Sequence, residues 1–118
     1  MIGAAIEVHR ELGPGLLESV YEGCLAHELT LRQVPFERQK ELPVRYRGAY
    51  LDFGFRMDFL VANELVFELK SVDQLNDLHS AQLLSYLRLS GSPVGLLLNF
   101  RVAAMKAGIR RIVSNYAG

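Results

Sequence analysis

The chain has 118 residues, half of them hydrophobic, and its 13 basic and 13 acidic side chains give a net charge of zero. This length predicts one domain over residues 1–118. No apolar run approaches the roughly 20 residues that cross a bilayer, and no export leader is present, so we expect a cytoplasmic protein. The single cysteine, Cys24, excludes an internal disulfide, a four-cysteine zinc site and a protein-bound iron–sulfur cluster.

The charge is unevenly distributed along the chain. Residues 1–77 contain all 13 acidic residues and 8 basic ones, whereas residues 78–118 contain five basic residues and no acidic one. Lys and Arg neutralise phosphates and so supply most of the non-specific affinity for nucleic acid. The candidate nucleic-acid contacts are therefore the C-terminal basic residues Arg88, Arg101, Lys106, Arg110 and Arg111. The alternative is a dipolar surface that binds no ligand.

Two helices are predicted at the start of the chain. The spacing of apolar residues indicates a helix over residues 1–12 and a second over residues 16–32, with Gly-Pro-Gly between them. Glu18 lies in the first turn of the second helix, where the helix dipole favours an acid in any case. Tyr21 and Glu22 follow three and four residues later, so the three side chains share one helix face.

The next segment is predicted to be extended. We expect one strand over Phe36–Tyr46, with Pro43 marking an edge or a bulge, then a turn at Arg47-Gly48 and a run from Tyr50 to Phe55. The segment has four basic residues, Arg38, Lys40, Arg45 and Arg47. They either contact a phosphate backbone or form a solvated strand face, and we favour the solvated face.

A β-hairpin is predicted over Arg56–Lys70, because two apolar runs flank a three-residue linker that contains an Asn. If these three residues form the loop, Val61 pairs with Leu65 and Asp58 lies opposite Glu68. Directly opposite residues have Cβ atoms roughly 5 Å apart, close enough for two carboxylates to hold one divalent cation.

The same alternation places Lys70 beside Glu68 and turns Leu69 toward a core. Two acids and a lysine in a half-buried setting are seldom required for stability. The hairpin therefore predicts a functional site, with an ordinary solvated strand face as the alternative.

A third helix is predicted over Gln74–Leu89, capped by Ser71 or Asp73. His79, Gln82 and Tyr86 form a stripe along it, and we expect His79 to lie at the surface or to contact substrate rather than metal. Five leucines are expected to face the core: Leu75, Leu78, Leu83, Leu84 and Leu87.

The last elements are a buried strand and a mixed segment. Val94–Phe100 is an apolar run that predicts a strand parallel to the strand ending at Lys70, reached by a crossover. Val102–Val113 is expected to form a helix or a mixture of helix and strand.

Several of these residues resemble motifs of one superfamily. Asp58 followed by Glu68-Leu69-Lys70 resembles the PD-(D/E)XK nuclease superfamily. Gly15-x-x-Glu18-x-x-Tyr21 resembles the signature of the GxxExxY protein family, which is placed in that superfamily. Gln82-x-x-x-Tyr86 resembles the QxxxY element of RecB-like nucleases. The resemblance runs nearly end to end, although Arg101 stands where the family often has glycine.

The resemblance implies a restriction-endonuclease-like α/β sandwich with a central mixed sheet, in the order αα-βββ-α-β-α. It also implies a nuclease that hydrolyses phosphodiesters, with DNA favoured over RNA. Asp58 and Glu68 would hold Mg²⁺ or Mn²⁺, helped by the Leu69 carbonyl and by Glu18. Lys70 would orient the attacking water or stabilise the charge on the phosphoryl oxygens. The QxxxY element adds two catalytic positions, Gln82 and Tyr86.

Two other interpretations stay open. The first is a binding module for nucleic acid or protein that keeps the fold without turnover, since the chain is small and neutral and shows no aromatic platform in sequence. The second is a homodimer that builds a composite groove, because one domain of this size barely covers a duplex.

Overall fold

The computed structural model describes residues 2–115. Within these residues there are three α-helices: α1 (Ile2–Leu12), α2 (Glu18–Leu31) and α3 (Asp77–Ser90). A short 3₁₀ helix, η1, spans Met105–Gly108. The strands are β1 (Phe36–Glu41), β2 (Val44–Tyr46), β3 (Ala49–Leu51), β4 (Arg56–Val61), β5 (Leu65–Lys70), β6 (Val94–Asn99) and β7 (Ile109–Val113).

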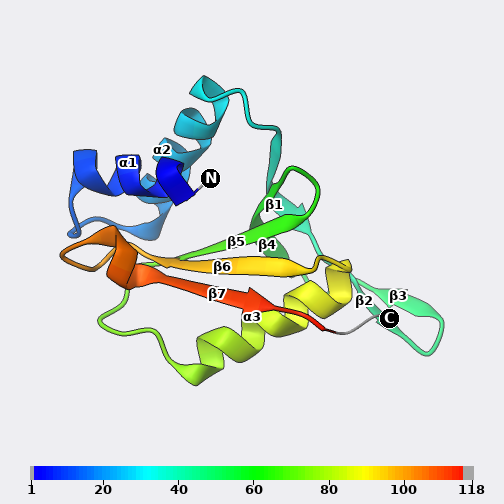
Figure 1. Cartoon of the computed structure of the whole chain (residues 1–118). Coiled ribbons are helices and arrows are strands. Elements are labelled where there is room, and N and C mark those ends of the chain that lie inside the picture. The colour runs from blue at the N-terminus through cyan, green and yellow to red at the C-terminus, as the bar shows by residue number, and fades with distance from the viewer. Residues whose placement is uncertain (1, 116–118) are drawn as a thin grey trace.

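A five-stranded sheet forms the centre of the fold, in the order β1-β4-β5-β6-β7. Strands β5 and β6 are parallel and joined through α3, whereas the other neighbours are antiparallel. Figure 1 shows α1 and α2 on one side of the sheet and α3 on the other. The predicted α/β sandwich with a central mixed sheet is confirmed.

Two hydrophobic clusters hold the layers together. The cluster under α1 and α2 includes Tyr21, Leu25, Phe59, Phe67 and Phe100. The cluster under α3 is smaller and includes Met57, Val66, Leu83, Leu87 and Leu97. Successive residues of β5 alternate between the two clusters, because side chains of a strand point to opposite faces.

The central hairpin has the predicted register. Val61 pairs with Leu65, and two of the three loop residues, Ala62 and Asn63, adopt positive φ angles of 54° and 61°. Asn tolerates this conformation well, which makes it a frequent residue of tight turns. The parallel pairing of β5 with β6 is also found, with Leu65 opposite Val94.

The single strand predicted over Phe36–Tyr46 is wrong. Strand β1 ends at Glu41, and β2 pairs with β3 in a separate two-stranded sheet. Pro43 lies at the break, where its missing N–H prevents the ladder from continuing. The N–H of Leu42 instead donates to the Phe55 carbonyl at 3.0 Å and closes the base of the β2–β3 hairpin.

The start of α3 also differs from the prediction. Asn76 is the N-cap, and His79 completes a reciprocal capping box with it, so neither Ser71 nor Asp73 caps the helix. Leu78 does not pack inward and is 76% exposed. It lies five residues before the buried Leu83, which places it about 140° around the helix axis.

Residues 102–113 form a mixture of helix and strand, which was one of the two predicted alternatives. The final α-helix of the predicted order αα-βββ-α-β-α is not found in the described residues. One turn of 3₁₀ helix is followed by β7, which pairs with β6. Ile109, Ile112 and Val113 are β-branched and favour a strand at this sheet edge. Within residues 2–115, no helix is both long and apolar enough to cross a membrane.

Candidate active site

Tyr21 anchors the loop that leads into α2. Its buried hydroxyl donates to the Gly13 carbonyl at 2.5 Å and accepts from the Leu16 N–H at 3.1 Å. Its ring stacks on Phe100 with a centroid distance of 4.4 Å. Tyr21 therefore acts as a structural residue that fixes where the helix begins.

Glu18, the first residue of α2, reaches the end of β5. Its carboxylate accepts from the N–H of Ser71 at 3.3 Å, and the Ser71 hydroxyl donates to the Leu16 carbonyl at 3.0 Å. Ser71 directly follows Lys70, so these bonds hold Glu18 at the end of the strand that carries the ExK motif.

Asp58 and Glu68 meet where the β4–β5 ladder opens. The ladder pairs Phe59 with Phe67, and beyond this pair the side chains take over the hydrogen bonds of the backbone. The N–H of Leu69 donates to Asp58 Oδ2 at 2.8 Å, and the N–H of Asp58 donates to Glu68 Oε1 at 3.1 Å. The two carboxyl groups thus lie together, as their register predicts.

Glu68 is the more buried of the two acids, with 8% of its surface exposed. Burial, followed by the negative charge of Asp58, raises the pKa of Glu68 to about 8, against a smaller lowering by the Asp58 N–H and then by Lys70. Near neutral pH this carboxyl group therefore holds a proton in much of the metal-free protein. A bound cation would relieve the same repulsion and displace that proton.

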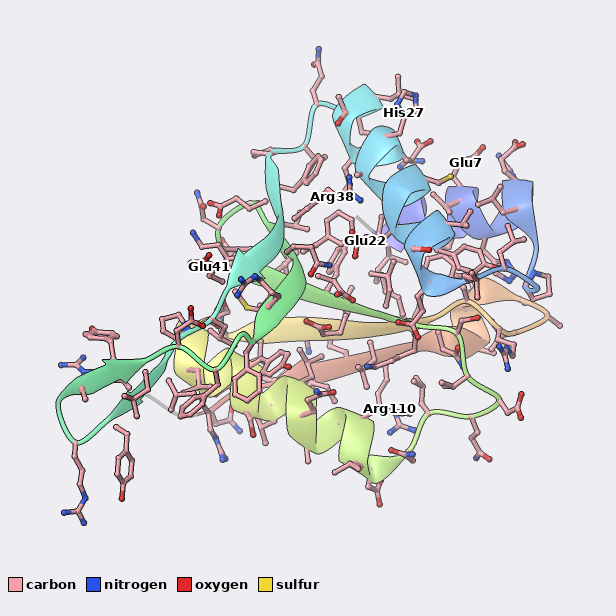
Figure 2. The ribbon with its side chains drawn as sticks, turned by 180° about the vertical axis from the view of Figure 1, so that it is seen from behind. Glu7, Glu22, His27, Arg38, Glu41 and Arg110 are labelled. Atoms are coloured by element: carbon pink, nitrogen blue, oxygen red, sulfur yellow. The ribbon has the colours of Figure 1, made fainter. Side chains whose placement is uncertain are left out.

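Gln39 and Glu22 join this site, and the sequence prediction missed both. Gln39 Nε2 donates to Glu22 Oε1 at 2.6 Å and to Asp58 Oδ1 at 3.3 Å, so one amide bridges α2 and β4. Glu22 also accepts from Arg38 at 2.9 Å, and Figure 2 shows these two side chains together between α2 and β1.

The sequence held a signal for only one of these two residues. Glu22 lies one helical turn after Glu18, a spacing that places both acids on one face. Gln39 adopts a φ of 49°, which only the folded backbone reveals.

The QxxxY pair of α3 reaches the two acids through Tyr86. Gln82 Nε2 donates to the Tyr86 hydroxyl at 3.3 Å. Burial, and next the charge of Glu68, raises the pKa of Tyr86, so this phenol lies within electrostatic reach of the site. His79, from the same stripe, is engaged in the cap of α3.

The five C-terminal basic residues lie on α3, in the turn after β6, on η1 and on β7. Arg101 pairs with Asp73 at 3.2 Å. Arg110 donates to the Ser80 hydroxyl at 2.8 Å and to the Asn76 carbonyl, so it supports the start of α3, as Figure 2 shows. Arg88 lies on α3, Lys106 on η1 and Arg111 on β7.

The donor set suits a hard divalent cation. Between residues 2 and 115 no three His, Cys, Asp or Glu side chains are close enough to hold an ion, whereas Asp58 and Glu68 lie together as a pair of carboxyl groups. Mg²⁺ commonly binds through one or two carboxylates and keeps several waters, and the pair fits this chemistry.

A family model described as the PD-(D/E)XK nuclease superfamily matches residues 1–112. The match covers the chain from α1 into β7 and includes Glu18, Asp58, Glu68, Lys70 and Tyr86. No curated protein and no solved structure matches the chain.

Proposed function

The chain belongs to the PD-(D/E)XK nuclease superfamily, and from this we propose that it is a metal-dependent nuclease that hydrolyses phosphodiester bonds, with DNA as its substrate. The observation that carries the proposal is the pairing of Asp58 and Glu68 at the open end of the β4–β5 hairpin. We also propose that it falls in the GxxExxY family, since Gly15, Glu18 and Tyr21 follow that spacing.

In this proposal Asp58 and Glu68 would hold Mg²⁺ or Mn²⁺, with the Leu69 carbonyl as a further ligand. Glu18, which accepts from the Ser71 N–H, would contribute through water. The bound cation supplies Lewis acidity at the scissile phosphate. Glu68 would hold the ion in its deprotonated form, because carboxylate ligands bind metals without their proton. Asp58 is held in place by the Leu69 N–H and by Gln39.

The remaining residues act on the substrate. Lys70 lies on the same strand face as Glu68 and offers a positive charge to the negative charge that develops on the phosphoryl oxygens. Gln82 and Tyr86 are joined by their own hydrogen bond and would position the phosphate or the attacking water. The protein would act in the cytoplasm as one domain, alone, as a homodimer or with a partner protein.

The decisive experiment combines metal titration with cleavage assays. Asp58→Ala and Glu68→Ala should abolish Mg²⁺ uptake in calorimetry and reduce cleavage of labelled DNA by about a hundredfold or more. Glu64→Ala is the matched control, because Glu64 is exposed in the turn of the same hairpin. Full activity in either site variant would overturn the mechanism. Absence of cleavage in the wild type, with DNA and RNA in both single- and double-stranded form, would favour a binding module.

A further inference from the structure

The β2–β3 hairpin forms an arm that stands apart from the body. We define the arm as residues 43–54; its two strands pair only with each other, around a turn at Arg47 and Gly48 with positive φ angles. Figure 1 shows the arm extending away from the five-stranded sheet. Its base is fixed to the body by the hydrogen bond between Leu42 and Phe55.

The arm is rich in exposed aromatic and cationic side chains. Tyr46 and Tyr50 are 59% and 69% exposed. Arg45 lies over the Tyr50 ring at 5.5 Å, and Arg47 lies over the Tyr46 ring at 5.7 Å. The arm has one acidic residue, Asp52, which accepts from the Gly54 N–H at 2.8 Å near the base, and none lies between positions 42 and 51. The tip therefore presents flat π faces together with positive charge, which a hydrophobic core does not require.

Aromatic side chains continue from the arm to the candidate active site. Phe53, at the end of the arm, is 62% exposed and lies 6.2 Å from Phe55. Phe55 lies 6.2 Å from Tyr86 of the QxxxY pair. The ring row, Phe53, Phe55 and Tyr86, thus runs from the base of the arm to α3, where Tyr86 feels the charge of Glu68.

A hollow of about 340 Å³ lies at the base of the arm. Two cations and one aromatic ring line it, Lys40, Arg45 and Tyr50, together with the apolar Met57 and Leu60. The one acidic residue of the lining, Glu41, pairs with Arg56 at 3.7 Å. An apolar floor with cations beside it suits a planar base that is attached to a phosphate.

We propose that the arm and the ring row bind single-stranded nucleic acid by stacking on its bases and lead the strand to the Asp58–Glu68 site, an inference that rests on the proposed function. Aromatic rings and Arg planes recognise unpaired bases, since a duplex hides the faces of its bases within the stack. The negatively charged backbone of a nucleic acid complements the two arginines of the arm. The arm of a second copy of the chain carries the same arginines and would be repelled.

The test measures binding separately from cleavage. A fluorescent oligothymidylate of about 15 nucleotides is titrated with the full chain in EDTA, and anisotropy reports the affinity. We compare the wild type with Tyr46→Leu/Tyr50→Leu, which keeps apolar bulk, and with Tyr46→Phe/Tyr50→Phe, which keeps the rings. The phenylalanine variant should bind like the wild type and the leucine variant at least roughly tenfold more weakly. Arg45→Gln/Arg47→Gln should bind more weakly and with a smaller dependence on salt.

Three results would overturn the inference: equal binding by the leucine and phenylalanine variants, a preference for a duplex of the same length, or an arm-dependent dimer in sedimentation without oligonucleotide binding.

Metal-dependent hydrolysis of bis(p-nitrophenyl) phosphate separates this inference from the proposed function. It should be the same in the arm variants as in the wild type. If the leucine variant loses oligonucleotide binding while the wild type hydrolyses no phosphodiester, the arm inference stands and the nuclease proposal fails.

Discussion

The N–H of Asp58 donates to a carboxylate oxygen of Glu68 at 3.1 Å, at the point where β4 and β5 separate. The bond brings two acids together in a largely buried place, and the protein accommodates them by retaining a proton on Glu68. A site of this kind is less stable as an empty dianion than as a protonated pair. The proton and a bound cation are therefore alternative ways to neutralise the same charge.

The metal-free protein should lose stability as the pH rises from about 4.5 to 8, because Glu68 has its pKa raised from 4.5 to about 8. Over this window the folded state binds a proton that the unfolded chain has released, so raising the pH favours unfolding. The change is on the order of several kcal/mol, since one pKa unit corresponds to about 1.4 kcal/mol. Urea unfolding in EDTA across this range measures the effect.

Glu68→Gln is the informative variant for this prediction. The amide resembles the protonated carboxyl group, so the variant should be more stable than the wild type at pH 8 and should show a flatter dependence on pH. Glu64→Gln, in the exposed turn of the same hairpin, should behave like the wild type. An unchanged pH dependence in Glu68→Gln would mean that another group holds the proton.

Gln39 should position Asp58 for metal binding. Gln39→Ala removes the amide that joins Glu22 to Asp58, and loss of such a supporting contact typically weakens metal affinity by about tenfold or more. Gln39→Gly should lose the same affinity and yet unfold at a higher temperature than Gln39→Ala, because glycine tolerates the φ of 49°. Calorimetric Mg²⁺ titration and thermal unfolding separate the two effects. Wild-type metal affinity in both variants would assign Gln39 a structural role.

Tyr21 and Tyr86 should respond differently to the loss of their hydroxyl groups. Tyr21→Phe keeps the stack on Phe100 but leaves Gly13 and Leu16 without their partner, at a cost of about 1–3 kcal/mol of stability. Tyr86→Phe breaks one exposed bond to Gln82 and should change stability little, while it lowers the cleavage rate. Urea unfolding and initial rates are measured for both variants. A Tyr21 variant of normal stability that fails to cleave would reverse the two roles.

The hairpin could be predicted from sequence because its signals are local. A three-residue linker and strict alternation fix the pairing of Val61 with Leu65, and the positions of Asp58 and Glu68 follow from this pairing. The parallel strand was predictable for a related reason, since a helix between two apolar runs imposes a crossover.

The remaining features depend on contacts that no local pattern contains. The division of Phe36–Tyr46 into two strands, which creates the arm, depends on Pro43 and on the bond from Leu42 to Phe55. Gln39 contacts Glu22 and Asp58, which are 17 and 19 residues away in the chain. The first turn of α3 is supported by Arg110, which donates to the Asn76 carbonyl from 34 residues further along the chain.

Gly108 should be intolerant of substitution, because it lies against the turn after β6. A Cβ added there would lie 2.0 Å from the Asn99 carbonyl oxygen, a backbone atom that cannot move aside as a side chain can. Asn99 is buried and uses its amide to hold Val72 by two hydrogen bonds, so the displacement would reach the segment after Lys70. We expect Gly108→Ala to cost about 1–3 kcal/mol of unfolding free energy.

Gly23→Ala is the matched control for Gly108→Ala. Gly23 lies within α2 with nothing within 4 Å of an added Cβ, so the same change should stabilise the protein by about 0.5–1 kcal/mol. Urea unfolding of the two variants beside the wild type measures both effects. Equal stability of Gly108→Ala and the wild type would show that the turn between β6 and β7 can shift away from Asn99. Lower stability of Gly23→Ala would show that α2 makes a contact at this position.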